Sequence, residues 1–167
     1  MSTELRASDP AETRDRLRDA MQRRDLPAAV ATFAPDVILH SPILGGPPFE
    51  GPQAVGDLLG AVMTNFDDYT YTAVSGSGDM QMLAFHARVR GHDVDVVDLL
   101  RMDGAGRVRE ITVHIRPMAG LAHVAAALGP HLARGPLHRI LITAFSRPLA
   151  LLLSLAEPLV PRLIRTR

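Results

Sequence analysis

The chain of 167 residues is 47% hydrophobic, so it is long enough and apolar enough for one domain with a buried core. Its 18 basic residues are all arginine and balance 18 acidic residues, so no net charge is available to attract nucleic acid or an anionic membrane. The chain has no cysteine, which excludes disulfides, thiolate nucleophiles and cysteine-ligated metals.

Two helices are predicted near the N-terminus. They follow a polar and acidic start that differs from the apolar core of a signal peptide, so we expect a cytoplasmic protein. The sequence DPAE at residues 9–12 supplies a capping carboxylate, a proline suited to the first helical position and a glutamate three residues after the cap. This pattern predicts a helix that runs to about Arg24. A short second helix is expected from Asp25 to Phe33.

A first strand and a third helix follow, joined by a turn rich in proline and glycine. The sequence DVILHS at residues 36–41 is typical of a strand, and the turn ends it because proline cannot donate a ladder hydrogen bond. By strand alternation, Leu39 and Ser41 face a cavity on one side of the sheet and His40 faces away. Apolar residues at helical spacing predict a helix over residues 51–66.

The second half of the chain changes to a period of two, which predicts strands at 69–75, 80–90, 92–102 and 107–116. Short glycine-containing turns between the last three strands predict an antiparallel meander. One more helix is expected in the sequence GLAHVAAALGPHLARG. Helices, a strand, a helix and then a run of strands indicate an α+β fold, in which a curved antiparallel sheet wraps around helices.

The last part of the chain is expected to be an extension, separate from a folded domain of residues 1–134. Residues 130–167 hold six arginines and the single acid Glu157. The uncharged core of this segment is too short to span a bilayer, and three prolines divide it into short helical pieces. We expect this apolar, arginine-flanked helical extension (residues 135–167) to cover the sheet, a pocket mouth or a second subunit, with a membrane surface as the less favoured alternative.

Asp98 is the most informative residue of its strand. Alternation places Val94, Val96, Leu100 and Met102 on the same face as Asp98, so one carboxyl lies on an otherwise apolar face. Burial disfavours the charged form, so the pKa of Asp98 is expected to rise unless the carboxyl gains hydrogen-bond donors. Such a group is suited to act as an acid or as a donor that stabilises an oxyanion. The alternative is a structural carboxyl that backbone or hydroxyl groups satisfy.

Histidines and arginines of the meander are predicted to lie on the opposite face of the sheet. In MLAFHARVR and REITVHIRP, apolar residues alternate with His86, Arg88, His114 and Arg116, which therefore share the outer face. That arrangement is more typical of a solvated or subunit-facing surface than of a catalytic cluster. No spacing matches an established metal-ligand, P-loop or dinucleotide motif, so neither a metal nor an organic cofactor is expected. Nucleic-acid binding is not expected either, because no basic stripe interleaves with aromatic residues.

Three stretches of the sequence carry a resemblance to a known family. They are DLPAAVATFAPDVILHSP (a helix and the first strand), FEGPQAVGDLL (the next helix) and VDVVDLLRMDGAGRVREITVHIRP (the closing hairpin). Through them, residues 11–134 resemble the NTF2-like superfamily, a cone-shaped α+β fold that includes SnoaL-like polyketide cyclases and ketosteroid isomerases. The resemblance implies one NTF2-like, SnoaL-like domain over residues 1–134. It implies less about activity, because this fold hosts enzymes and binding proteins alike.

Carried over residue by residue, the resemblance keeps one catalytic position of the ketosteroid isomerases and loses two. The carboxylic acid that binds the developing oxyanion in those enzymes falls on Asp98. Their base, an aspartate before a proline, falls on Ser41, and the oxyanion-hole tyrosine of their first helix falls on Leu17. The acidic residue that the cyclases and epoxide hydrolases carry on the last strand falls on Val113. Steroid isomerisation by the family's own set of residues is therefore not expected.

These observations lead to two hypotheses. The first is a cofactor-independent isomerase or cyclase that acts by proton transfer on a hydrophobic carbonyl compound, with Asp98 as acid or donor and either His40 or a water held by Ser41 as base. The second is a non-catalytic ligand-binding or oligomerisation module in which Asp98 is structural. A hydrophobic small molecule as ligand and a homodimer are expected. The predicted ligand-binding residues are Leu39, Phe85, Val94, Val96, Val113 and Ile115.

Overall fold

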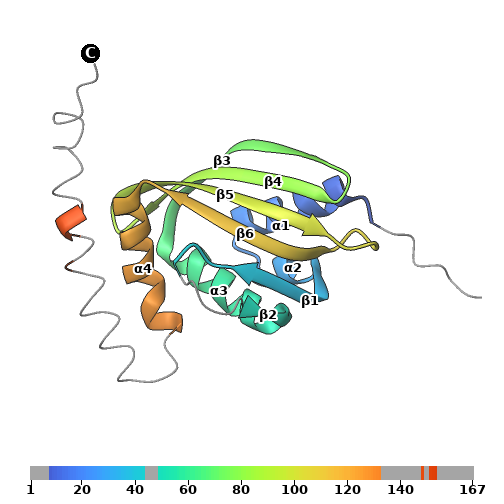
Figure 1. The fold of residues 1–167 in the computed structure, drawn as a ribbon, viewed down its shortest axis with the longest axis horizontal. Helices are drawn as coiled ribbons and strands as arrows, with labels where there is room; N and C mark the ends of the chain where they lie inside the picture. Colours follow the sequence, from blue (N-terminus) through green and yellow to red (C-terminus); the bar gives the residue numbers. More distant parts are fainter. Residues whose placement is uncertain (1–7, 44–48, 133–147, 149–150, 154–167) are drawn as a thin grey trace, which may run out of the picture.

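The structure, a computed structural model, describes residues 8–43, 49–132, 148 and 151–153. Its elements in chain order are α1 (Pro10–Arg23), α2 (Leu26–Val30), β1 (Phe33–His40), β2 (Phe49–Glu50), α3 (Gly51–Asn65), β3 (Phe66–Ser77), β4 (Met80–Val89), β5 (His92–Met102), β6 (Val108–Arg116) and α4 (Met118–Leu132). Figure 1 shows a curved sheet with α1, α2 and α3 on one side and α4 at one end. This is the predicted α+β arrangement of a sheet wrapped around helices.

The six strands form one sheet in the order β2-β1-β6-β5-β4-β3. Strands β3 to β6 are antiparallel neighbours, which confirms the predicted meander. The sheet is not antiparallel throughout, because β1 runs parallel to β6. The turn between β4 and β5 consists of Arg90 and Gly91, whose φ angles of 53° and 83° suit a two-residue hairpin turn. The meander thus presents one continuous inner face to the helices.

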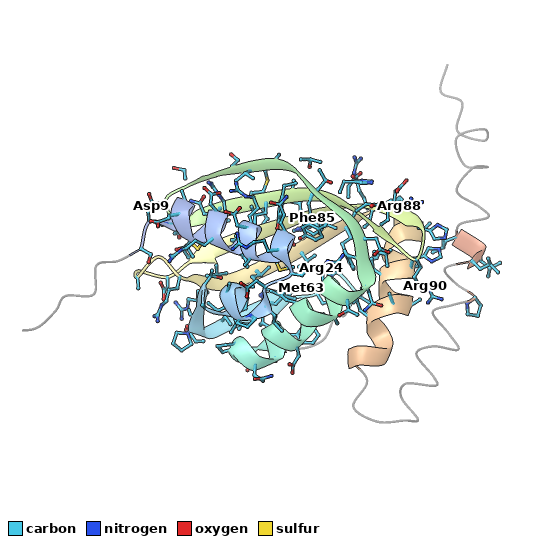
Figure 2. The ribbon with its side chains drawn as sticks, turned by 180° about the vertical axis from the view of Figure 1, so that it is seen from behind. Asp9, Arg24, Met63, Phe85, Arg88 and Arg90 are labelled. Atoms are coloured by element: carbon cyan, nitrogen blue, oxygen red, sulfur yellow. The ribbon has the colours of Figure 1, made fainter. Side chains whose placement is uncertain are left out.

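The first helix begins where the sequence predicts it. The carboxylate of Asp9 accepts a hydrogen bond from the backbone N of Ala11 at 2.9 Å, and a proline occupies the first turn. The helix ends at Arg23, and the capping residue Arg24 that follows has a left-handed φ of 56°. The guanidinium of Arg24 donates hydrogen bonds to the backbone oxygens of Met63 and Phe66, at the junction labelled in Figure 2. These bonds tie the end of α1 to the point where α3 passes into β3.

The second helix is shorter and the first strand longer than the sequence predicts. Helix α2 ends after Val30, and Thr32 donates its hydroxyl to the backbone oxygen of Ala29 at 2.7 Å just beyond it. Phe33, which the sequence places in the helix, already pairs with Val108 of β6. The apolar run around Phe33 suits a helix and a buried strand alike, and pairing with β6 decides between them.

The hydrophobic core lies between the inner face of the sheet and the helices. Both layers contribute fully buried side chains, namely Leu39, Leu83, Leu100, Val37, Val55, Val89, Val94, Val108 and Val124. Burial of one such side chain stabilises a fold by about 1.5–3 kcal/mol relative to exposure. The core therefore fixes the walls that surround the cavity described below.

Two predicted features fall mainly outside the described residues. Residues 44–48 of the turn rich in proline and glycine are outside them, and so is most of the C-terminal extension, apart from residues 148 and 151–153. The role of the extension, the homodimer and the cytoplasmic location stay predictions. Within the described part of the chain, no helix is long and apolar enough to cross a membrane.

Candidate functional site

A cavity of about 70 Å³ lies between the inner face of the sheet and helices α1, α3 and α4. A single water needs roughly 10–15 Å³ on this measure, so the cavity is larger than a packing defect. Its walls are apolar side chains from these helices and from β1 and β3–β6, with four polar exceptions: Ser41, Tyr69, Tyr71 and Asp98. The chemistry of the cavity therefore depends on these four residues.

Asp98 enters the cavity from β5. Its neighbours across the sheet are Leu83 of β4 and Val113 of β6, both of which line the cavity. No side chain or backbone group of the described residues hydrogen-bonds to its carboxyl, and desolvation alone raises the pKa of Asp98 from 3.8 to about 7. Part of its surface opens to the cavity, so water there moderates the desolvation. The carboxyl therefore changes its protonation state near neutral pH.

Two tyrosines of β3 line the same cavity and contact each other. Their hydroxyl oxygens lie 3.3 Å apart, and their rings meet edge to face with centroids separated by 5.3 Å. Tyr69 also stacks on Phe85 at a centroid distance of 4.2 Å. Burial is the main cause that raises the pKa of both hydroxyls above the usual value, and the nearby Asp98 carboxylate raises them further. Tyr69 and Tyr71 thus remain protonated donors at neutral pH.

A bulge in β3 turns these tyrosines inward. Phe66 at the start of the strand is buried in the core, and simple alternation from it would place Tyr69 and Tyr71 on the outer face. The register between β3 and β4 shifts by one residue between Asp67 and Thr70. Asp68, which lies in this interval, adopts a positive φ of 51°. The extra residue reverses the alternation, so Tyr71 lies opposite the inward-facing Phe85.

The described residues that line the cavity include no basic side chain. Besides Asp98, the charged groups that act on the hydroxyl pair are Arg18 and Asp19 of α1, which influence Tyr71 and pair with each other at 2.9 Å. An anionic ligand would lack a counter-charge, whereas a neutral ligand with an oxygen acceptor would meet hydroxyl donors. The site suits a neutral and largely apolar molecule.

The two other predicted catalytic residues lie on opposite sides of the end of β1. Ser41 lines the cavity, as alternation predicts, and its hydroxyl accepts a hydrogen bond from the backbone N of Ile43 at 3.2 Å. His40 faces away, and its Nε2 lies 3.2 Å from Oε1 of Glu110. The structure therefore brings Ser41 and Asp98 to one cavity and leaves His40 outside it.

Five of the six predicted ligand-binding residues line the cavity: Leu39, Phe85, Val96, Val113 and Ile115. Figure 2 shows Phe85 in the interior of the domain. Val94 shares their face but lies outside the lining, because α4 covers it. A Cβ atom at Gly120 of α4 would lie only 2.7 Å from Cγ1 of Val94. Alternation thus identifies the face of a strand but not the part of that face that a helix covers.

The sequence reasoning missed the tyrosine pair and the helical wall of the cavity. Leu17 and Met21 of α1 line it, as do Val124 and Leu128 of α4. Each pair has a spacing of four residues, which places both side chains on one helix face, so this signal was present in the sequence. The tyrosines had no comparable signal, because the bulge that turns them inward is not visible in a period-two pattern.

The outer face of the sheet carries ion-paired side chains, as the alternation of the meander predicts. His86 lies 3.5 Å from Asp93 and 3.2 Å from Asp95, and Arg116 pairs with Asp95 at 3.0 Å. Arg88 pairs with Asp93 at 3.3 Å. These pairs lie on the outer surface of the sheet, away from the cavity. In the ranges that the structure describes, no group of three or more histidine, aspartate or glutamate side chains is placed to hold a metal ion.

Comparisons with known proteins identify a matching domain family and several similar solved structures. The SnoaL-like domain model matches residues 15–129. A solved steroid delta-isomerase from Pseudomonas aeruginosa is 31% identical, with a TM-score of 0.69 over 74% of this chain and 90% of that chain. An uncharacterized protein with a cystatin-like fold from Silicibacter pomeroyi DSS-3 is 25% identical, with a TM-score of 0.66 over 70% of this chain and 82% of that chain. No curated protein matches the chain.

A more distant likeness extends the comparison to cyclases. SalBIII, an epoxide hydrolase/cyclase-like enzyme in pyran ring formation of the polyether salinomycin, is 17% identical. Its TM-score is 0.56 over 66% of this chain and 92% of that chain, and at this identity the likeness shows the fold alone. The comparisons confirm the predicted α+β fold.

Proposed function

The chain belongs to the SnoaL-like domain family of the NTF2-like superfamily, and from this premise we propose that it is a cofactor-independent isomerase or cyclase. Its substrate is a neutral, hydrophobic carbonyl compound whose conversion requires the movement of a proton. The observation that carries the proposal is Asp98, a carboxyl in an apolar cavity that has no hydrogen-bond partner among the described residues.

The chemistry follows from the pKa of Asp98. A pKa of about 7 populates both the ionised and the protonated form near neutral pH, so the carboxyl can take up a proton and return it. Because His40 lies outside the cavity, the proposed role of Asp98 differs from the predicted acid or donor and becomes that of the base. In an isomerisation, its carboxylate removes a proton from the carbon next to the carbonyl, and the electron pair of that C–H bond moves into an enolate. The carboxyl then returns the proton to another carbon of the conjugated system. The reaction consumes no proton, electron or cofactor.

The likeness to a steroid delta-isomerase supports proton transfer but not the same substrate. Ser41 and Leu17 stand where the ketosteroid isomerases carry a base and a tyrosine, so two of their three catalytic positions differ here. The apolar walls support a hydrophobic substrate and keep bulk water from the enolate.

A non-catalytic ligand-binding module is the second candidate, and the position of His40 favours it. His40, predicted to be the base, pairs with Glu110 away from the cavity, and the hydroxyl of Ser41 accepts a hydrogen bond from Ile43. Asp98 is then the one group of the described lining that titrates near neutral pH. In this alternative, the protonated carboxyl anchors a neutral ligand and no bond is made or broken.

Turnover by Asp98→Asn and Asp95→Asn variants separates the two candidates. Asp95 is a matched control, because it carries the same side chain on the same strand and faces the outer surface. Cyclic β,γ-unsaturated ketones of increasing ring number are the test substrates, and ultraviolet absorbance follows their conjugated products. We expect the wild type and D95N to convert the ketones and D98N to lose about 10²–10⁴-fold in rate.

Native mass spectrometry of the protein as purified gives the mass of any ligand retained in the cavity, and titration calorimetry measures binding of the same ketones. Binding without turnover by the wild type would favour the module. Equal turnover by D98N and the wild type would refute the role of Asp98. If no ketone binds the wild type, the carbonyl ligand class itself is wrong.

A further inference from the structure

The hydroxyl pair of Tyr69 and Tyr71 has no part in the function proposed so far. We propose that this pair is the oxygen-binding point of the cavity: it donates the hydrogen bond that holds the carbonyl oxygen of the substrate, while Asp98 faces the adjacent carbon. The inference rests on the proposed function and narrows the substrate to a neutral, enolisable ketone. The oxygen-binding role then falls to β3. The first helix has no donor for it, because Leu17 lines the cavity where the ketosteroid isomerases carry their oxyanion-hole tyrosine.

Whichever tyrosine donates the hydrogen bond between them, one hydroxyl proton of the pair is not used in that bond. One hydroxyl donates to the other across 3.3 Å, and the accepting hydroxyl keeps its own O–H for a third partner. No acceptor in the described part of the protein takes that proton. A buried donor without a partner is unfavourable, so the free O–H is available to an acceptor atom in the cavity.

The division of roles follows from how the three groups titrate. Burial keeps Tyr69 and Tyr71 protonated at neutral pH, so they donate at every working pH. Asp98 changes its protonation state near pH 7 and is therefore the group that can carry a proton. The carboxyl of Asp98 acts on both hydroxyls through its charge but hydrogen-bonds to neither, and all three groups line the one cavity that a ligand would occupy.

The surrounding residues hold the hydroxyl pair in place and add little charge. The ring of Tyr69 stacks on Phe85 at 4.2 Å, and the ring of Tyr71 meets the same phenylalanine edge-on at 5.6 Å. Arg18 and Asp19 of α1 act on Tyr71 and pair with each other. Helices α3 and α4 and strands β1, β4 and β6 contribute no charged side chain to the described lining. The donors are thus oriented before a ligand binds.

The proposed hydrogen bond strengthens during the reaction. When the carboxylate of Asp98 takes the proton from the carbon next to the carbonyl, the C–H electron pair forms a carbon–carbon double bond and the carbonyl π electrons move to the oxygen. The O–H of the tyrosine pair then donates to an oxygen that carries negative charge, and such bonds are stronger than neutral ones. Donors that gain strength in this way accelerate the step as well as tighten binding.

Infrared spectroscopy of a bound enone tests the assignment, because the C=O stretching frequency falls when the oxygen accepts a hydrogen bond. The probe is a bicyclic conjugated enone with an isotopically labelled carbonyl. We expect a lowered frequency in the wild type, in D98N and in the control Thr70→Val, which removes an exposed hydroxyl from the outer face of the same strand. In the double variant Tyr69→Phe/Tyr71→Phe the lowering is lost, affinity falls roughly 3–10-fold and kcat falls roughly 10²–10³-fold.

The pH dependence adds a second readout. The carbonyl frequency of the wild-type complex should be the same at about pH 6 and about pH 8, because the tyrosines do not titrate there, whereas kcat/KM should rise through about pH 7 as Asp98 ionises. A frequency that rises with pH in the wild type and is constant in D98N would overturn the inference, since Asp98 would then hold the oxygen.

Three further outcomes separate the inference from the proposed function. A wild-type frequency in the double variant would overturn the inference and leave the carbonyl ligand class intact. No binding of the enone by the wild type would overturn the proposed function itself. If thermal unfolding shows that the double variant does not fold, the single variants Tyr69→Phe and Tyr71→Phe replace it. Each retains one hydroxyl, and at least one of them must show a smaller frequency shift than the wild type for the inference to stand.

Discussion

Two aspartates of β5, Asp95 and Asp98, show how strongly the two faces of one sheet differ. Asp95 lies on the outer face, 3.2 Å from His86 and 3.0 Å from Arg116. The hydrogen bond from His86, aided by Arg116, holds the pKa of its carboxyl below the usual value. Asp98 faces the cavity without a partner among the described residues, and desolvation raises its pKa to about 7. The same side chain is thus a permanent charge on one face and a titrating group on the other.

The partners of a carboxyl, and not its residue type, separate a surface aspartate such as Asp95 from a candidate catalytic one such as Asp98. Exposed ion pairs such as those of Asp95 contribute about 0–1 kcal/mol each. An ionised Asp98 in the apolar cavity destabilises the fold instead, because no donor compensates the lost hydration. The ion pairs of Asp95 thus stabilise the fold, whereas an ionised Asp98 does not, and a carboxyl in such an environment is the kind of group that the proposed function requires.

The largest effect is expected on the pH dependence of stability of the variant Asp98→Asn. Because the folded-state pKa of about 7 lies above the ordinary value of 3.8, the folded protein keeps this proton over a range in which the unfolded chain has lost it. The contribution of Asp98 to the free energy of unfolding is fully present below about pH 4 and is lost as pH rises through about 7. The wild type should lose up to about 4 kcal/mol relative to D98N over that range, less the part that cavity water offsets. Urea unfolding at several pH values measures the difference.

The variant Asp95→Asn supplies the contrast. The lowered pKa of Asp95 means that its stabilisation is present above the ordinary carboxylate pKa and is lost only as pH falls through the lowered one. Its replacement should therefore cost less than about 1 kcal/mol, with a far smaller trend between about pH 5 and about pH 8 than that of D98N. Parallel pH profiles for D95N and D98N would mean that the pKa values of the two carboxyls are not shifted in opposite directions.

A smaller effect is expected at the bulge that turns β3 toward the cavity. Asp68 has a φ of 51°, and a β-branched residue in that conformation is strained by about 1–2 kcal/mol, so Asp68→Val should lower the free energy of unfolding by that amount. Asp68→Gly removes the same weak ion pair with Arg88, at 3.8 Å, without the strain, and is the matched control. Equal losses for valine and glycine would contradict the strain.

Deleting Asp68 tests the consequence of the bulge for the inner face. Without the extra residue, alternation sends Tyr69 and Tyr71 to the outer face, where their hydroxyls ionise near the ordinary pKa of about 10. These are the two tyrosines of the chain, so an absorbance titration reports on them alone. In the wild type both should resist ionisation at that pH. A folded deletion variant with an unchanged titration would show that the bulge does not set their direction.

The parts of the site that the sequence predicts are those built on regular structure. The cap at Asp9 and the alternation of β5 depend on local rules, and the register between β4 and β5 runs without a shift past Asp98. The cavity face of Asp98 and Ser41 could therefore be predicted. The same rule placed His40 on the far side, and only the common use of histidine as a general base made it a candidate.

The parts that the sequence does not predict depend on contacts between distant segments. The tyrosine pair faces inward because one residue is inserted at Asp68, and a period-two pattern does not reveal such an insertion. Val94 leaves the cavity lining because Gly120 brings α4 close to it. Phe33 belongs to a strand because it pairs with β6, although its local sequence also suits a helix. Each difference is a case in which tertiary packing overrides a local pattern.

The smallest effect is expected where β5 meets α4, in an environment intermediate between the two faces. His92 stacks on His123 with ring centroids 3.5 Å apart. Burial, followed by the positive charges of His92 and Arg90, lowers the pKa of His123 below 6.5. The unfolded chain then takes up this proton before the folded protein does, so stability falls as pH drops through about 6.5, a trend opposite to that of Asp98.

The variant His123→Phe retains a ring for the stack and removes the titrating group. Between about pH 7 and about pH 5 it should lose less stability than the wild type, by under about 1 kcal/mol because His123 is only partly buried. His114→Phe is the control, since His114 is exposed on the outer face. Because Asp98 is present in all three proteins, its opposite trend cancels in the comparison of urea midpoints. Equal pH slopes for H123F and the wild type would place His123 with the solvated groups of the outer face and leave Asp98 as the residue whose burial governs the pH response.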